Sequence, residues 1–158
     1  MNNVEYQTIH QTGWNELHVD GTTVISVFIN KKQRQVITAH VGDSRAIMIT
    51  STESYDLTAD HKPSNPREKE RIEMLGGEII TLGVQRVQGI LAVSRALGDF
   101  SLKPFVSNVP TVSYYELTGK ECFLVMASDG LWDVMDHDDV AMLLQSYVAQ
   151  VGREEKER

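Results

Sequence analysis

Acidic residues stand beside glycine at the ends of several strand-like stretches. Asp43 and Asp99 each follow a glycine, Asp129 precedes one, and Asp133 comes four residues after Asp129. The ends of strands in one sheet can meet at one rim, and carboxylates that converge there suit a hard cation such as Mg²⁺, Mn²⁺ or Ca²⁺. Two ionised carboxylates about 4 Å apart repel by roughly 4 kcal/mol at an effective dielectric constant near 20, so such a cluster favours a bound cation or a raised pKa.

The same aspartates also have a structural interpretation. Asp beside Gly is ordinary turn chemistry, and Asp133 could begin the acidic lead-in to the last helix. Zinc and thiol chemistry are disfavoured, because the five histidines lack zinc-ligand spacing and the single cysteine, Cys122, opens an apolar strand. We expect Cys122 to be buried and inert. Gly76-Gly77 ends a helix, so it does not form a nucleotide-binding loop.

Composition places the chain among globular proteins. It has 158 residues, 41% of them hydrophobic, and a mean hydropathy of −0.25, which predicts one packed domain or part of one. A net charge of −7 argues against nucleic-acid binding, and the basic run at residues 31–34 is interpreted as a hairpin tip. The longest apolar run, residues 122–127, is too short for a membrane span, and the N-terminus has no leader pattern. We expect no membrane association and a cytoplasmic or nuclear location.

Strand patterns dominate the middle of the chain. Residues 22–30, 35–41 and 45–49 are rich in β-branched side chains and are expected to form an antiparallel meander, with Gly42-Asp43 as a tight turn. Shorter strands are expected at residues 78–82, 87–93, 111–115 and 121–127.

Two helices are predicted from their end signals. Asn65 can cap a helix that has proline at its first position and Glu68 three residues after the cap, and Gly76-Gly77 ends it. The last helix is expected to follow Asp136 and to stop at Gly152.

Five sequence motifs follow one another in a fixed order. They are Gly21-Thr22-Thr23; residues 41–46; Asp60-His61-Lys62-Pro63 with residues 68–72 and Gly76-Gly77; residues 91–99; and residues 127–134. Together they resemble the metal-dependent protein phosphatases, the type 2C serine/threonine family, and the resemblance extends from about Asp20 to Val148.

The resemblance implies both a fold and a reaction. The implied fold is α+β, with two packed antiparallel β-sheets flanked by helices in an α-β-β-α sandwich. The implied reaction is hydrolysis of phosphoserine and phosphothreonine in proteins, which are then the expected partners. Two or three Mg²⁺ or Mn²⁺ ions serve the complete domain, and a metal-bridging water attacks phosphorus directly.

Metal ligands are assigned by position in the motifs. Asp129 resembles a ligand of the catalytic metal pair. Asp43 and Asp133, together with Asp129, resemble an additional metal site beside that pair. The other motif residues are interpreted as structural: Asp99 and Arg95 in a buried charge-assisted contact, and Asp60 and His61 as scaffold for the loop before the first helix.

Three parts of the family pattern do not occur in the sequence. They are the early Asp-Gly-His-Gly-Gly run with its metal carboxylate and candidate general acid, the arginine that grips phosphate, and the late Asp-Asn ligand motif. We therefore assign no catalytic residue and expect a phosphatase domain truncated at both ends. Residues 20–152 are the expected partial domain, after a non-matching segment 1–19 and before a charged tail 153–158.

Two functions remain open on this interpretation. The first is a metal-dependent protein serine/threonine phosphatase of which this chain is a fragment. The alternative is a non-catalytic phosphatase-like module that binds a protein partner or a second copy through a sheet left uncovered. A calcium-binding sheet protein unrelated to phosphatases is a third possibility.

Overall fold

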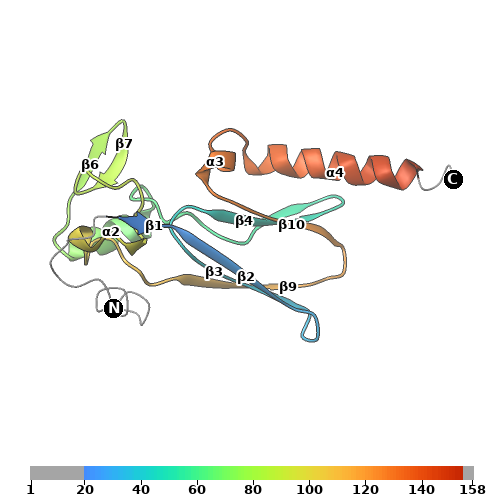
Figure 1. The fold of residues 1–158 in the computed structure, drawn as a ribbon, viewed down its shortest axis with the longest axis horizontal. Coiled ribbons are helices and arrows are strands. Elements are labelled where there is room, and N and C mark those ends of the chain that lie inside the picture. Colours follow the sequence, from blue (N-terminus) through green and yellow to red (C-terminus); the bar gives the residue numbers. More distant parts are fainter. Residues whose placement is uncertain (1–19, 155–158) are drawn as a thin grey trace. The chain divides into compact units, whose positions relative to one another are not determined.

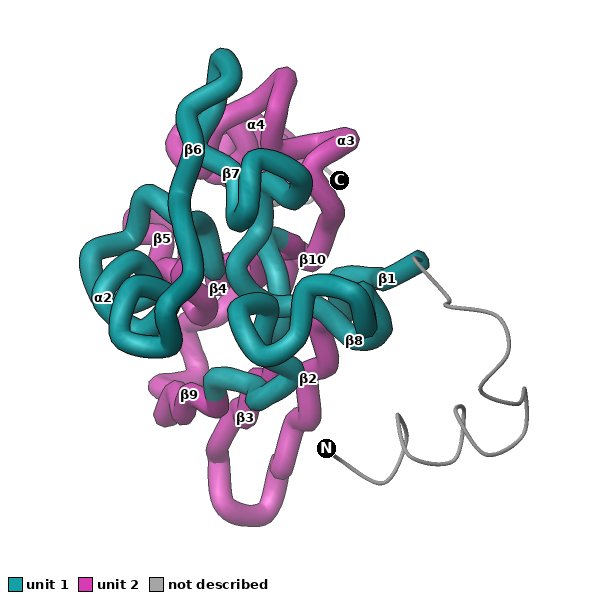
Figure 2. Tube along the Cα trace, turned by 90° about the vertical axis from the view of Figure 1, so that its left-hand side faces the viewer, with its two compact units in different colours: residues 1–24, 40–43, 60–111 teal, residues 25–39, 44–59, 112–158 magenta. Residues whose placement is uncertain are grey.

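The computed structural model describes residues 20–154, and these fall into two compact units. Figure 2 colours them separately. Unit 1 takes residues 1–24, 40–43 and 60–111, and unit 2 takes residues 25–39, 44–59 and 112–158. The chain therefore passes between the units several times.

Unit 2 is built mainly from two three-stranded sheets. One sheet has the antiparallel order β10 (Glu121–Ala127), β4 (Arg45–Thr50), β5 (Ser54–Asp56). The other has the order β2 (Val24–Asn30), β3 (Gln35–Val41), β9 (Thr111–Glu116). A turn at residues 31–34 joins β2 to β3, as the basic run predicted.

Strand β4 supplies both cores of unit 2 because its side chains alternate between the two faces. Ile47 and Ile49 are fully buried in one core with Trp132 and with residues of the C-terminal helix α4 (His137–Glu154). Ala46 and Met48 point the other way into a second core with Val36, Leu57 and partly buried β2 residues. Figure 1 shows the resulting layers of this unit, with α4 on one side of β4 and β10 and with β2, β3 and β9 on the other.

The outer face of the β2-β3-β9 sheet exposes large apolar side chains. Tyr115 of β9 packs into the second core, so Val112 and Tyr114, which lie on the opposite face of the strand, point away from that core. Phe28 lies on the same face as Tyr114, because the residue before it, Val27, packs inward. Phe28 is 65% exposed and Tyr114 is 67% exposed. We call Phe28, Val112 and Tyr114 the outer sheet face.

Unit 1 packs one helix against loops and short strands. Helix α2 (Pro66–Met74) begins as predicted, with the Asn65 side chain accepting a hydrogen bond from the Arg67 N–H. Ile72 on its inner side is fully buried with Val87 and Val106. The other elements are the hairpin β6 (Ile79–Leu82) and β7 (Val84–Val87), the pair β1 (Gly21–Thr22) and β8 (Leu97–Gly98), and the 3₁₀ helix η1 (Phe100–Leu102).

The α+β expectation is confirmed, and several local predictions are wrong. Strands β3 and β4 belong to different sheets, so the predicted meander breaks at Gly42-Asp43. Residues 88–90 form a turn after β7, in place of the strand predicted at 87–93, and the Ile90 N–H donates to the Val87 carbonyl. Helix α4 continues through Gly152 to Glu154. Strand β5 and the short helix α3 (Asp129–Trp132) were not predicted.

Cys122 is exposed, which contradicts the expectation of a core thiol. The pairing of β10 with β4 shifts register between Glu121 and Phe123. This irregularity breaks the alternation that would have placed the thiol inside. Among the described residues, no helix is long and apolar enough to cross a membrane.

Candidate functional site

His61 fixes the turn that carries Asp43 through hydrogen bonds to both backbone groups of Gly42. The His61 N–H donates to the Gly42 carbonyl at 3.0 Å, and the Gly42 N–H donates to His61 Nδ1 at 3.1 Å. Because Nδ1 accepts a hydrogen bond, the ring proton of neutral His61 is on Nε2, which lies 2.8 Å from Thr111 Oγ1. Next along the chain, Lys62 Nζ forms an ion pair with Asp43 Oδ2.

Only glycine suits position 42. Its φ of +96° is in the left-handed region, and a Cβ there would lie 2.3 Å from Thr23 Cγ2. Thr23 and His61 thus hold the backbone of the Gly-Asp turn closely, and this turn carries the Asp43 carboxylate.

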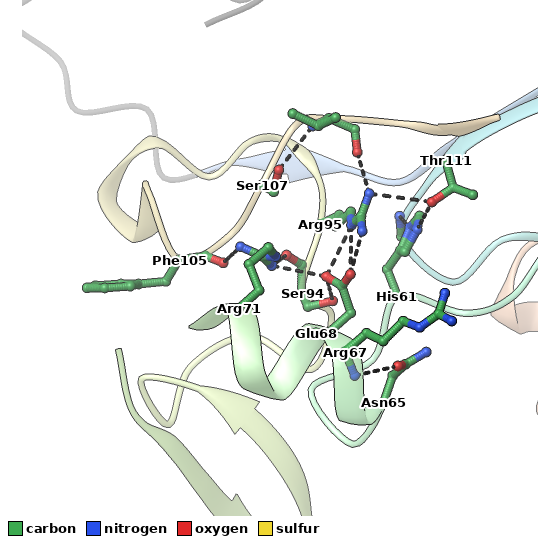
Figure 3. A network of polar contacts seen from close by, with 12 residues as sticks. His61, Asn65, Arg67, Glu68, Arg71, Ser94, Arg95, Phe105, Ser107 and Thr111 are labelled. Atoms are coloured by element: carbon green, nitrogen blue, oxygen red, sulfur yellow. Dashed lines mark hydrogen bonds and ion pairs between the residues drawn. The ribbon is translucent and has the colours of Figure 1, made fainter. Parts of the chain in front are cut away.

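The carboxylate of Glu68 is the centre of a polar network in unit 1, drawn in Figure 3. Arg95 approaches Glu68 with two groups, Nη2 at 2.5 Å from Oε1 and Nε at 3.1 Å from each oxygen. Arg71 Nη2 donates to Oε2 at 3.0 Å, and the Ser94 hydroxyl donates to the same oxygen at 2.8 Å. Glu68 is only 3% exposed, so its charge is balanced by protein groups and not by water.

The two arginines also bind the loops around the helix. Arg71 donates to the carbonyls of Phe105 and Ser94, both at 2.9 Å. Arg95 donates to the Val109 carbonyl at 2.8 Å and reaches Thr111 Oγ1 at 3.4 Å. Arg95 and His61 therefore both contact the hydroxyl oxygen of Thr111, as Figure 3 shows.

Two pKa shifts follow from this network. Burial raises the pKa of Glu68, but the hydrogen bonds from Arg95, Ser94 and Arg71 outweigh burial and hold it at about 2. Burial, followed by the nearby Arg95 charge, lowers the pKa of His61 to about 4. His61 is 4% exposed and stacks on His40 with ring centroids 4.3 Å apart. At neutral pH Glu68 is ionised and His61 is neutral.

Asp99 and Asp60 lie elsewhere in unit 1. Asp99 is 8% exposed, and burial raises the pKa of its carboxyl group. Its N–H donates to the Asp20 carbonyl, and its side chain lies so close to Gly21 that a Cβ there would be 1.8 Å from Oδ2. Asp99 and Arg95 were expected to share a buried charge-assisted contact, but the carboxylate that Arg95 binds is that of Glu68. Asp60 is half-buried and directly precedes His61.

Asp129 and Asp133 lie in unit 2, at the end of β10. Asp129 is the first residue of α3, and its carbonyl accepts the Asp133 N–H at 2.8 Å, one helical turn away. Both side chains are exposed. The helix is anchored by Trp132, whose indole N–H donates to the Ala127 carbonyl at 2.9 Å. These contacts fix the backbone that carries the two aspartates.

The residues fit the expected metal ions only in part. Carboxylates are the right donors for Mg²⁺ or Mn²⁺. However, no group of three or more His, Cys, Asp or Glu side chains within residues 20–154 could hold a metal ion. Asp43 belongs to unit 1 and its carboxylate pairs with Lys62, whereas Asp129 and Asp133 belong to unit 2. Within residues 20–154 the carboxylates are therefore donors of the right kind without a cluster of three.

Sequence reasoning missed the roles of Glu68, Lys62 and Thr111. Glu68 was interpreted as a helix-capping residue, but it lies on the buried side of α2. The available signal was its spacing, because Glu68 and buried Ile72 are four residues apart and so share one helix face. No local signal marks Thr111, whose partners are 16 and 50 residues away.

Comparison with known proteins identifies relatives over most of the chain. The family model described as Protein phosphatase 2C matches residues 3–156, which begins before the Asp20 limit of the motif resemblance. Probable protein phosphatase 2C 8 of Oryza sativa subsp. japonica is 42% identical over 123 residues, covering 78% of this chain and 30% of that protein. Protein phosphatase 2C 3 of Arabidopsis thaliana is 40% identical over 127 residues, covering 80% of this chain and 28% of that protein.

Solved structures give the same result. A serine-threonine phosphatase 2C from Toxoplasma gondii superposes with a TM-score of 0.76 at 28% identity, covering 98% of this chain and 54% of that one. A C. elegans sex-determining protein superposes with a TM-score of 0.81 at 29% identity, covering 91% of this chain and 34% of that one. The chain spans about a third of the length of the curated relatives it matches.

Replacing Glu68 tests the importance of its buried charge. We expect Glu68→Gln to lower the free energy of unfolding by about 3 kcal/mol, because two arginines lose the charge that balances them. Glu73→Gln is the matched control, since Glu73 pairs with Lys69 on the exposed side of the same helix; it should cost less than about 1 kcal/mol. Urea unfolding measures both, and equal losses would contradict the assignment.

The lowered pKa of His61 predicts a pH dependence of stability. The unfolded chain takes up a proton at the ordinary pKa of 6.5, whereas folded His61 resists until about pH 4. Its contribution is therefore complete above pH 6.5 and is lost as the pH falls towards 4, by roughly 3 kcal/mol. Urea unfolding at pH 7, 5.5 and 4 measures this loss. His61→Gln should flatten the dependence in this window, and an unchanged dependence would refute the prediction.

Proposed function

The chain belongs to the protein phosphatase 2C family, and from this premise we propose that it is part of a metal-dependent hydrolase that dephosphorylates phosphoserine and phosphothreonine in proteins. The observation that carries the proposal is the family match over residues 3–156. The chain spans about a third of its curated relatives, so the activity of the whole protein is inferred from kinship.

We propose Asp43, Asp129 and Asp133 as carboxylates that contribute to binding Mg²⁺ or Mn²⁺. Their residue type supports this role, since both ions prefer oxygen ligands. The rigid backbone around each also supports it: His61 clamps the turn before Asp43, and Trp132 anchors the short helix that carries Asp129. When the backbone is already held in place, less conformational entropy is lost when a metal ion binds the side chain that this backbone carries.

We propose that substrates are phosphoproteins and that the protein acts in the cytoplasm or nucleus. The net charge of −7 favours phosphopeptides with flanking Lys or Arg, an attraction that added salt weakens.

Hydrolysis of a phosphothreonine peptide tests the proposed reaction. Any phosphate release by the 158-residue chain should require millimolar Mn²⁺, and Asp129→Asn should reduce that rate by roughly 10- to 100-fold or more through loss of a ligand. Asp138→Asn is the matched control, an exposed aspartate in the first turn of α4, and should keep the rate. Turnover without Mn²⁺, or equal turnover by Asp129→Asn, would contradict the proposal. No turnover from the folded chain would confine the activity to longer members of the family and favour a fragment or a binding module.

A non-catalytic binding module is the second candidate, and the outer sheet face favours it. Phe28 on β2 and Val112 and Tyr114 on β9 each expose an apolar side chain on one face of this sheet, and exposed apolar side chains on strands can bind a protein partner or a second copy. Sedimentation of the purified chain distinguishes the two candidates when combined with the peptide assay. Self-association without turnover supports the binding module, and a monomer with Mn²⁺-dependent turnover excludes it.

A further inference from the structure

Strand β10 lies at the edge of its sheet. It pairs with β4 on one side, and the order β10-β4-β5 gives it no strand on the other side within residues 20–154. Hydrogen bonds from another described strand therefore do not reach the outer N–H and carbonyl groups of residues 121–127. An unpaired row of this kind is a template for a further strand.

The sequence of β10 lacks the features that usually protect an edge strand, which are charged side chains, proline and bulges. Residues 122–127 contain no charged residue and no proline. The register shift between Glu121 and Phe123 is confined to the start of the strand, so residues 123–127 keep a regular edge. Cys122 is exposed and Met126 is 49% exposed, so two apolar side chains accompany the unpaired backbone.

An antiparallel edge is complementary to an identical edge. A two-fold axis through Leu124, the middle residue of β10, places the outward N–H groups of one copy opposite the outward carbonyl groups of the other. The same axis places the start of each β10 beside the end of the other. Met126 of each copy then lies beside Cys122 of the second copy.

The charges at the two ends of β10 are opposite in sign. Exposed Lys120 precedes the strand, and exposed Asp129 follows it. The two-fold pairing brings Lys120 of each copy close to Asp129 of the other, and this attraction stabilises the pair. The carboxylate of Glu121 faces its own loop, where it accepts the N–H groups of Thr118 at 2.7 Å and Gly119 at 2.9 Å. Charge complementarity thus favours a second copy as the strand that covers this edge.

We propose that two copies of this chain pair antiparallel through β10 and join their three-stranded sheets into one continuous sheet. The axis runs perpendicular to the sheet, so both α4 helices cover the same face of it. This surface differs from the outer sheet face, which lies on the β2-β3-β9 sheet. The pairing does not require phosphatase activity and so goes beyond the proposed function.

Analytical ultracentrifugation of the 158-residue chain tests the pairing, and we expect a dimer at micromolar concentration. The double variant Cys122→Lys with Met126→Lys should raise the dimer dissociation constant roughly tenfold or more, because lysines of the two copies then face each other across the edge. Tyr114→Lys on the outer sheet face is the matched control and should leave the constant unchanged. Both sets of substitutions are at exposed positions, and far-ultraviolet circular dichroism shows whether each variant is folded.

Charge reversal tests the contact at the strand ends. Lys120→Glu should also weaken the dimer, because it places a second acidic side chain beside Asp129. Lys32→Glu, in the exposed turn between β2 and β3, changes the net charge equally and should leave the dimer unchanged.

A disulfide cross-link tests the register of the two strands. Met126→Cys places a thiol beside Cys122 of the other copy, and oxidation with diamide should give a covalent dimer on a non-reducing gel. The wild-type chain should not cross-link, because its two Cys122 residues lie roughly 13 Å apart along the strands, beyond the reach of a disulfide. Val112→Cys on the outer sheet face is the control and should not cross-link either.

A wild-type chain that stays monomeric at these concentrations would overturn the proposal. So would a dimer that the double lysine variant leaves intact, a dimer that Tyr114→Lys dissociates, or the absence of a covalent dimer with Met126→Cys. A monomer with Mn²⁺-dependent turnover would overturn the pairing and support the proposed function. A β10 dimer without turnover would support the pairing and leave the activity to longer members of the family, so the two ideas fail separately.

Discussion

A buried carboxylate must be balanced, and this constraint organises unit 1. Glu68 is 3% exposed and ionised, so its charge requires donors from its surroundings. Arg71 comes from the same helix, and Ser94 and Arg95 come from a loop more than 20 residues later. Each arginine then uses its remaining N–H groups on loop carbonyls. One acidic side chain thereby fixes α2 and the segment 94–111 together.

The same network reaches the turn that carries Asp43. Arg95 and His61 both contact Thr111, and the positive charge of Arg95 helps to keep His61 neutral. A neutral ring can accept the Gly42 N–H, whereas a doubly protonated ring cannot. The family motifs around Glu68, His61 and Gly42 are thus parts of one arrangement. His61 within this arrangement holds the Gly-Asp turn in a conformation that glycine adopts easily.

Local signals in the sequence were enough to place most elements. The Asn65 cap, the β-branched strands and the α+β class all appear in the structure. Pairing between distant segments was harder, because β4 leaves its neighbour β3 to pair with β10 some 75 positions further on. Cys122 was misjudged since a register shift cannot be read from alternation alone. For the site, the motifs single out Asp43, Asp129 and Asp133 as metal ligands, which stays a prediction, whereas the partners of Asp43 and Glu68 depend on tertiary contacts.

The central claim is that His61 holds Gly42 and so positions Asp43, and nuclear magnetic resonance tests it most directly. Hydrogen exchange of the Gly42 amide should be slow, because this N–H donates to a buried ring nitrogen. The ¹⁵N shifts of His61 near pH 6.5 should show an unprotonated Nδ1 and a protonated Nε2. Gly42 exchange at the rate of an unstructured peptide, or a doubly protonated His61 ring at that pH, would contradict the account.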